Sequence, residues 1–234
     1  MGPRAWAHGA HLATQVERIE QSSTALAAPP TSFLPYRLPR GGSLPEGGMI
    51  PKHDLRAAAR ANRKRLAEAS PLAGERATAF VADMLGARPL HTAALYVAQG
   101  SEIDALPLAR SLVKAGLDLC LPVVIERDAA MIFRRWAPGD PLLPDAQGMP
   151  APLGDAETLA PDLIITPLLA FDRSGGRLGQ GGGYYDRTFA AFPNAWRIGL
   201  AYAGQEVENL PGESHDVPLH GVLTDVGHML CISH

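Results

Sequence analysis

The chain of 234 residues is long enough for one domain with a sizeable core, or for one domain and a tail. Hydrophobic residues make up 46% of it and charged residues 19%, which is ordinary for a globular protein. The net charge of −3 argues against general binding to nucleic acids or anionic membranes. No apolar run reaches the roughly 20 residues that cross a bilayer. Cys120 and Cys231 fit no disulfide framework, so we expect a cytoplasmic protein without a membrane partner.

Residues 1–50 differ in composition from the rest of the chain. Prolines and glycines accumulate there, namely Pro29, Pro30, Pro35, Pro39, Pro45, Gly41, Gly42, Gly47 and Gly48. Such a stretch has little apolar surface to bury and does not offset the entropy lost on ordering. We expect a disordered tail or an over-long gene start with Met49 as the true initiator, followed by a single domain over residues 51–234.

Two helices are predicted at the start of this domain. Positions on one face recur at spacings of three and four and indicate a helix, namely Leu55, Ala59, Asn62, Leu66 and Ala69. This helix is expected to end at Ser70-Pro71. A second helix is expected over residues 72–85, closed by Gly86 and Pro89, with Ala77, Phe80, Val81 and Met84 on its inner face.

Strands and helices are predicted to alternate from there on. We expect strands over 92–97, 117–124, 129–136, 162–166, 195–202 and 222–226, helices over 106–115 and 183–192, and a loop over 136–155. The run 117–124 is almost continuously apolar, as in a strand covered on both faces, and should bury Cys120. The alternation predicts an α/β domain, a three-layer α/β/α sandwich around a mostly parallel sheet. Ligands of such folds bind at the carboxyl ends of the strands.

A glycine-rich segment, residues 171–187, leads from a buried strand into the helix expected at 183–192. Its six glycines are Gly175, Gly176, Gly179, Gly181, Gly182 and Gly183. Glycine admits positive φ and lets the backbone approach a ligand closely. Successive N–H groups and a helix start together form an anion site that suits phosphate. Arg177 and Arg187 can add bidentate phosphate contacts, and Asp186 can hold a divalent cation that bridges phosphates.

The glycines alone are a weak signal. No Gly-Lys-Ser/Thr follows them, so the segment is not a Walker loop, and a dinucleotide fingerprint would come near the start of its domain. A flexible turn with an exposed tyrosine pair would weigh evenly against function if the glycines stood alone. Tyr184, Tyr185 and the pair Asp186-Arg187 in the same strand-to-helix turn favour the phosphate site.

The segment Arg177-Leu178-Gly179-x-Gly181-x-Gly183-Tyr184-Tyr185-Asp186 resembles the signature of the 5-formyltetrahydrofolate cyclo-ligase family, also called methenyltetrahydrofolate synthetase. The resemblance covers about residues 52–226 and includes Lys52-x-x-x-Arg56, Glu102-Ile103-Asp104, Leu121-Pro122, Met131, Pro150-x-Pro152, Gln205, Leu210-Pro211 and His215-Asp216. The chain departs from the pattern at Gly182, where the best-known members carry a lysine. Arg56, Arg177 and Arg187 are the candidates to supply that charge.

The resemblance implies an ATP-dependent ligase that uses Mg²⁺. ATP would phosphorylate the formyl oxygen of 5-formyltetrahydrofolate, N10 would attack the iminophosphate, and loss of phosphate would give 5,10-methenyltetrahydrofolate. The implied catalytic residues are Glu102, Arg177 and Tyr184, and the implied metal ligands are Asp186 and Asp216. The implied ATP-binding residues are Lys52, Arg56, Arg177, Gly179, Gln180, Gly181, Gly182, Gly183, Tyr185 and Asp186. The implied folate-binding residues are Glu102, Met131, Gln180 and Tyr184.

Simpler interpretations stay open for the single motifs. Lys52 and Arg56 alone would be a solvated basic edge, and Glu102 and Asp104 could cap the next helix. The histidines show no zinc spacing, and no nucleophile elbow accompanies His215. Rival functions are another nucleotide-dependent ligase or kinase on this scaffold, and a binding protein that has lost turnover. We expect a monomer whose partners are the small molecules ATP and 5-formyltetrahydrofolate.

Overall fold

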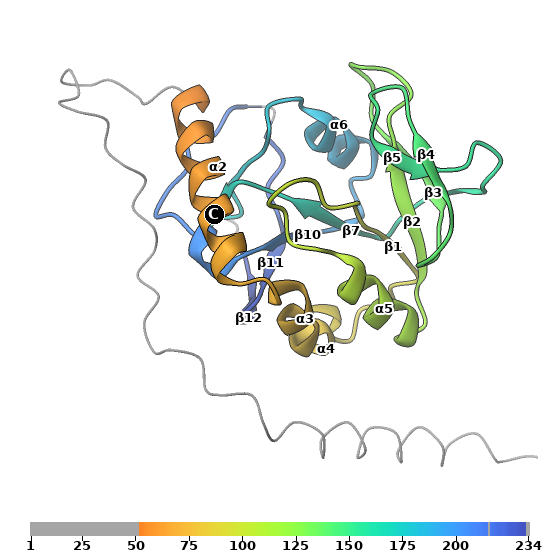
Figure 1. Cartoon of the computed structure of the whole chain (residues 1–234), viewed down its shortest axis with the longest axis horizontal. Coiled ribbons are helices and arrows are strands. Elements are labelled where there is room, and N and C mark those ends of the chain that lie inside the picture. Colours follow the sequence, from red (N-terminus) through yellow and green to blue (C-terminus); the bar gives the residue numbers. More distant parts are fainter. Residues whose placement is uncertain (1–51, 215, 233–234) are drawn as a thin grey trace, which may run out of the picture. The chain divides into compact units, whose positions relative to one another are not determined.

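A computed structural model of the chain describes residues 52–214 and 216–232 (Figure 1). The tail or gene start predicted for residues 1–50 lies outside the described residues, as does His215 of the C-terminal motif. Within the described part of the chain, none of the helices is long and apolar enough to span a membrane.

The helices of the structure follow the predicted order with one exception. They are α2 (Lys52–Ala69), α3 (Ala73–Ala77), the 3₁₀ turn η1 (Thr78–Phe80), α4 (Val81–Leu85), α5 (Leu106–Lys114), α6 (Tyr184–Ala191) and the 3₁₀ turn η2 (Ala203–Gln205). The single helix predicted over residues 72–85 is wrong, because η1 separates α3 from α4. Phe80 leaves helical geometry at φ −107° and ψ 9°. The interruption still leaves Ala77, Val81 and Met84 buried.

One sheet of eight strands forms the centre, in the order β12-β11-β10-β7-β1-β2-β3-β6. Its strands are β1 (Thr92–Ala94), β2 (Asp118–Val123), β3 (Ile132–Arg135), β6 (Thr158–Leu159), β7 (Leu163–Pro167), β10 (Trp196–Ala201), β11 (Gly221–Thr224) and β12 (Gly227–Leu230). The run β11-β10-β7-β1-β2 is parallel throughout. The remaining strands pair antiparallel at the two edges. The mostly parallel sheet of the predicted fold class is confirmed.

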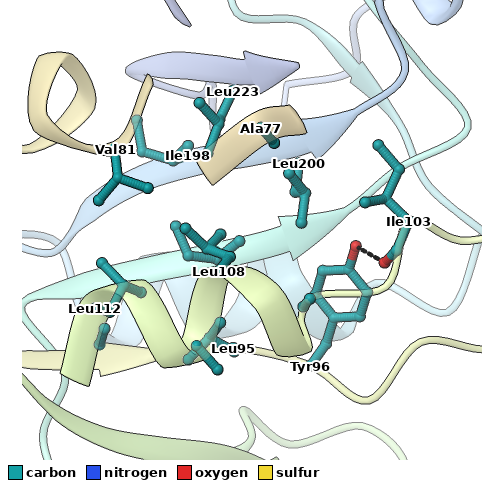
Figure 2. Packing of buried hydrophobic residues seen from close by; sticks show 14 of the residues in the cluster. Ala77, Val81, Leu95, Tyr96, Ile103, Leu108, Leu112, Ile198, Leu200 and Leu223 are labelled. Atoms are coloured by element: carbon teal, nitrogen blue, oxygen red, sulfur yellow. Dashed lines mark hydrogen bonds between the residues drawn. The ribbon is translucent and has the colours of Figure 1, made fainter. Parts of the chain in front are cut away.

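Side chains that alternate along the strands divide into two buried layers. Leu95, Ile198, Leu200 and Leu223 lie on the face that α3, α4 and α5 cover, where Leu108 of α5 packs among them (Figure 2). On the opposite face, which α6 covers in Figure 1, the core contains Ala94, Cys120, Ile164, Val222 and Phe189. Burial of this apolar surface on both faces is the main stabilisation of the three-layer fold.

Cys120 is fully buried in the second layer, as predicted for a structural thiol. Burial raises the pKa of its thiol to about 12. The thiolate is the reactive form of cysteine, so Cys120 is chemically inert at neutral pH.

Two short hairpins lie outside the main sheet. One pairs β4 (Leu142–Pro144) with β5 (Pro150–Pro152), inside the segment predicted to be loop. The other pairs β8 (Ala170–Phe171) with β9 (Arg177–Leu178), at the start of the glycine-rich segment. Strands of two or three residues rich in proline or glycine carry no periodicity, and this is why the sequence pattern missed them. Each hairpin places residues on the wall of the cavity described below.

Candidate functional site

A cavity of about 580 Å³ opens at the carboxyl ends of β1, β2 and β7. The residues that follow these strands form its floor, among them Tyr96, Val124 and Leu168. This is the edge of the sheet where the fold predicts ligands to bind. The structure brings most of the candidate residues together on its walls: Arg56, Glu102, Met131, Arg177, Gly179, Gln180, Gly181, Gly182, Gly183, Tyr184, Tyr185, Asp186 and Asp216. Lys52 begins α2.

The glycine-rich wall runs from β9 through Gly179 to Gly183 and into α6. Gly181 and Gly183 have φ values of +99° and +68°, which side chains with a Cβ rarely adopt. Gly183 is the N-cap residue of α6, so the loop delivers its backbone directly to a helix start. The exposed N–H groups and the helix dipole at this point favour an anion.

Two arginines of α2 form hydrogen bonds with this loop. Arg56 Nε donates to the Gly179 carbonyl oxygen at 3.1 Å, and Arg60 Nε donates to Gln180 Oε1 at 2.9 Å. Arg56 also packs against Gly181, where a Cβ would lie 3.2 Å from the guanidinium carbon. The first helix therefore fixes the loop and adds positive charge beside it.

Replacing Gly183 by alanine is expected to destabilise the protein and to weaken nucleotide binding. The new Cβ would lie 2.6 Å from Arg187 Nη1, and the left-handed backbone adds roughly 1–2 kcal/mol of strain. Thermal unfolding and ATP titration of the variant measure both effects. Gly179→Ala is the matched stability control, because its Cβ would meet nothing within 4 Å. Equal melting temperatures for the two variants would contradict the expected strain.

Asp172 anchors the β8–β9 hairpin that precedes the loop. Its Oδ1 accepts hydrogen bonds from Ser174 N at 3.0 Å, Ser174 Oγ at 2.6 Å and Gly176 N at 2.9 Å. Its Oδ2 accepts from Leu210 N at 2.9 Å. The side chain is buried and fully engaged, so it ties the hairpin turn to the C-terminal loop that carries Asp216.

Arg177 connects three parts of the site. One guanidinium nitrogen donates to the Val217 carbonyl oxygen and the other to Asp186 Oδ1. The guanidinium carbon lies 4.6 Å from the centre of the Phe189 ring. The side chain is only 7% exposed. These contacts engage both terminal guanidinium nitrogens. Arg177 therefore fixes the Asp186 carboxylate at the cavity wall and also places a positive charge there.

Arg187 lies on the outer side of the loop. Its Nε donates to Ala129 O at 3.1 Å, and its Nη2 donates to Arg127 O at 2.9 Å and Gly182 O at 3.0 Å. Its guanidinium also lies 5.1 Å from the centre of the Tyr184 ring. It thus ties the loop to the segment that leads to Met131.

Gly182 packs directly against Tyr184. A Cβ at this position would lie 3.0 Å from two carbons of the Tyr184 ring. A side chain at this position would therefore require the Tyr184 ring to shift slightly. The Tyr184 ring can lie this close to the loop because residue 182 is a glycine.

Glu102 lines the same cavity as the glycine-rich loop. Its Oε1 accepts from Arg63 Nη1 at 3.3 Å and its Oε2 from Gln99 N at 3.0 Å. Burial raises the pKa of the carboxyl group, and the Gln99 N–H and the Arg63 guanidinium oppose that rise. Glu102, the predicted substrate contact, therefore accepts a hydrogen bond at each of its two carboxyl oxygens.

Two tyrosines, the buried Tyr96 and the half-buried Tyr185, line the cavity together with Glu102. Tyr96 donates its hydroxyl hydrogen to the Ile103 carbonyl oxygen at 2.9 Å, drawn in Figure 2. Tyr185 is hydrogen-bonded to Thr166. Burial, with the nearby charge of Glu102, raises the pKa of both phenols well above the ordinary value. Both side chains are therefore neutral at physiological pH.

Met131 is buried and contributes an apolar patch to the cavity. Its backbone N–H donates to Thr188 Oγ1 at 3.1 Å, and this hydroxyl donates to the Tyr184 carbonyl oxygen at 2.7 Å. Helix α6 therefore sets the position of Met131 as well as that of Tyr184.

The residues present fit a divalent cation that is shared with phosphates. Among the described residues, no group of three or more His, Cys, Asp and Glu side chains could hold a metal ion by itself. Mg²⁺ usually takes one or two carboxylates and completes its shell with phosphate oxygens and water. Asp186 and Asp216 both line the cavity, which suits this arrangement.

Several lining residues were missed in the sequence, namely Arg63, Tyr96, Gln99, Asp145, Gln147 and Met149. The last three belong to the β4–β5 hairpin, whose Asp145 accepts from Val124 N at 3.0 Å and so anchors it beside β2. Arg63 had a signal, because it follows Ala59 by four residues and precedes Leu66 by three. A charged residue on a buried helical stripe needs a partner.

Comparison with known proteins gives consistent matches. A family model described as the 5-formyltetrahydrofolate cyclo-ligase family matches residues 49–225. A protein of Haemophilus influenzae named 5-formyltetrahydrofolate cyclo-ligase is 37% identical over 153 residues, which is 62% of this chain and 82% of the relative. A protein of Escherichia coli K12 with the same name is also 37% identical, over 57% of this chain and 78% of the relative.

Solved structures show the same relationship. The NMR structure of Aquifex aeolicus 5,10-methenyltetrahydrofolate synthetase superimposes with a TM-score of 0.64 at 28% identity, covering 79% of this chain and 95% of that one. A 5,10-methenyltetrahydrofolate synthetase from Mycoplasma pneumoniae shares the fold, with a TM-score of 0.59 at 22% identity.

Proposed function

Since the chain belongs to the 5-formyltetrahydrofolate cyclo-ligase family, we propose that it uses ATP to convert 5-formyltetrahydrofolate into 5,10-methenyltetrahydrofolate. The observation that carries the proposal is a single cavity with two different walls. One wall is a glycine-rich backbone with arginines beside it, and the other is apolar with a buried carboxylate. A volume of about 580 Å³ is in the range of cavities for small organic ligands.

The glycine-rich wall suits the phosphates of ATP. The N–H groups of the loop and the start of α6 provide donors for phosphate oxygens. Arg56 lies against Gly179 and Gly181, where it can neutralise charge, and Lys52 is one turn before it on α2. Asp186 and Asp216 would hold Mg²⁺, which would draw the phosphate oxygens together and offset their charge.

The opposite wall suits the folate. Met131 offers apolar contact for a ring, and Tyr184, the first residue of α6, lines the same cavity. Gln180 can hydrogen-bond the polar edge of the ligand. Glu102 can accept hydrogen bonds from its N–H groups and orient N10.

The proposed reaction then proceeds in two steps. The formyl oxygen attacks the γ-phosphorus, the bond between the β-phosphate oxygen and γ-phosphorus breaks, and ADP leaves. N10 of the same molecule attacks the activated formyl carbon and gives up its proton, and the C–O bond breaks to release phosphate. The protein contributes positioning and neutralisation of charge, and ring closure within one bound molecule gains from proximity.

The test is a spectrophotometric assay of the purified protein with Mg²⁺ and 5-formyltetrahydrofolate. An absorbance band of methenyl-folate should appear only when ATP is added, with one ADP and one phosphate formed per product. ATP consumption without the band would favour another nucleotide-dependent ligase or kinase. Folate binding by folded protein without turnover would favour a binding protein, and either result would contradict the proposal.

A further inference from the structure

Arg63 is an arginine on the buried side of α2. Its side chain is 7% exposed, whereas arginine is rarely buried unless it is paired. Its Nε donates to Ser101 Oγ at 3.1 Å, and its Nη1 donates to the Leu168 carbonyl oxygen at 3.2 Å and to Glu102 Oε1 at 3.3 Å. Contacts on two separate segments fix the guanidinium in one place.

The Glu102 side chain is 9% exposed and lines the same cavity as Arg63. An isolated carboxylate in such a place would be expected to take up a proton, because burial penalises the charged form. The Gln99 N–H binds Oε2, and the Arg63 guanidinium binds Oε1 and also brings a full positive charge.

We propose that Arg63 is a positioning residue for the reaction, which holds the Glu102 side chain as an anion in one orientation at the folate side of the cavity. This inference rests on the proposed function. Arg63 acts through Glu102, so removing it alters how the carboxylate meets the substrate while the carboxylate itself remains. A protonated Glu102 would present a donor where the substrate N–H groups need an acceptor.

The charged and titratable groups that face Glu102 come from three elements. Arg63 comes from α2, Tyr96 from the segment after β1, and Tyr185 from α6. Burial raises the pKa of both tyrosines, so they stay neutral over the pH range of the test. Arg63 is therefore the group whose charge opposes protonation of Glu102.

The test combines a titration that needs no substrate with a binding measurement. Carbon-13 NMR of labelled glutamate carboxyls follows the pKa of Glu102 in the unliganded protein, and calorimetry follows 5-formyltetrahydrofolate binding across pH. Arg63→Met should raise the pKa of Glu102 and move the loss of folate affinity in acid to higher pH by the same amount. Arg63→Lys, which keeps the charge, should shift both by less. Glu102→Gln identifies the NMR signal and should abolish the acid limb.

A merely structural role gives a different result. If Arg63→Met lowers the melting temperature but leaves the Glu102 titration and the acid limb unchanged, the proposal is overturned. Should that variant fail to fold, Arg63→Gln decides, because it removes the charge but keeps a hydrogen-bond donor, and an unchanged Glu102 pKa together with unchanged folate affinity would overturn the proposal equally. Absence of folate binding by the unsubstituted protein would instead contradict the proposed function. The NMR titration keeps these two failures apart.

Discussion

Arg177→Ala is expected to lower kcat/KM for ATP by about 10- to 150-fold, the equivalent of one charge-assisted contact worth roughly 1.5–3 kcal/mol. The substitution removes positive charge from the phosphate side of the cavity. It also releases Asp186, which Arg177 holds at the cavity wall. Steady-state kinetics with varied ATP and saturating folate measure the effect.

The same variant should lose stability, because removing the Arg177 guanidinium leaves the partly buried Asp186 carboxylate without its ion-pair partner. Breaking one partner of a buried pair costs about 3–5 kcal/mol. Arg177→Lys tests whether charge alone is enough for ATP use and stability. Lysine has a single side-chain nitrogen, whereas the planar guanidinium contacts Asp186 and Val217 O with two. Arg110→Ala, an exposed arginine on α5, is the matched control and should change neither property. Unchanged ATP kinetics in Arg177→Ala would refute the assigned role.

Glu102→Gln is expected to lower kcat/KM for 5-formyltetrahydrofolate on the order of 100-fold, because a misplaced substrate loses the benefit of proximity. The amide can still accept from Arg63, but it has no charge to pair with the guanidinium and presents a donor to the folate. ATP affinity should change much less, since the hydrogen bonds of Glu102 go to Arg63 and Gln99 and not to the glycine-rich loop. Kinetics with each substrate varied in turn, and Glu75→Gln on the exposed side of α3 as control, measure this selectivity. An equal effect on both substrates would argue against a folate contact.

The pH dependence of stability gives an independent check on Glu102. Burial raises the pKa of this carboxyl in the folded protein, so the folded state binds the proton more tightly than the unfolded chain does. Its stabilising contribution is thus complete below the ordinary pKa of glutamate and is lost as pH rises through the folded pKa. Glu102→Gln should lack this decline, which urea unfolding at several pH values can measure.

The periodic parts of the fold could be predicted from the sequence, because burial imposes a pattern on them. The stripe Leu55, Ala59 and Leu66 predicted α2, and the apolar run 117–124 predicted β2. The hairpins β4–β5 and β8–β9 are held by local anchors, Asp145 and Asp172, and not by periodicity. Their aspartates are common turn residues, so nothing in the sequence distinguished them.

The candidate site divides in the same way. The glycine-rich loop was readable because backbone shape requires glycine at Gly181 and Gly183, and the structure shows positive φ at both. The partners of each charged residue were not readable, because they lie far away in the chain. Arg177, expected to face phosphate, is engaged with Asp186 and Val217, and Arg63 meets Glu102 across 39 residues. Such pairings depend on tertiary packing, which brings segments distant in the chain together.

The long span between α2 and its partners has a consequence for synthesis on the ribosome. Arg56 contacts Gly179 across 123 residues of chain, and Asn62 contacts Gly204 across 142. Until those residues emerge, the apolar stripe of α2 has no place to dock, and long-range contacts of this kind form slowly. During much of translation, the nascent chain therefore leaves the apolar face of α2 exposed to solvent. Helix α2 therefore precedes the other described elements in synthesis but completes its contacts only after residues 179 and 204 have been made.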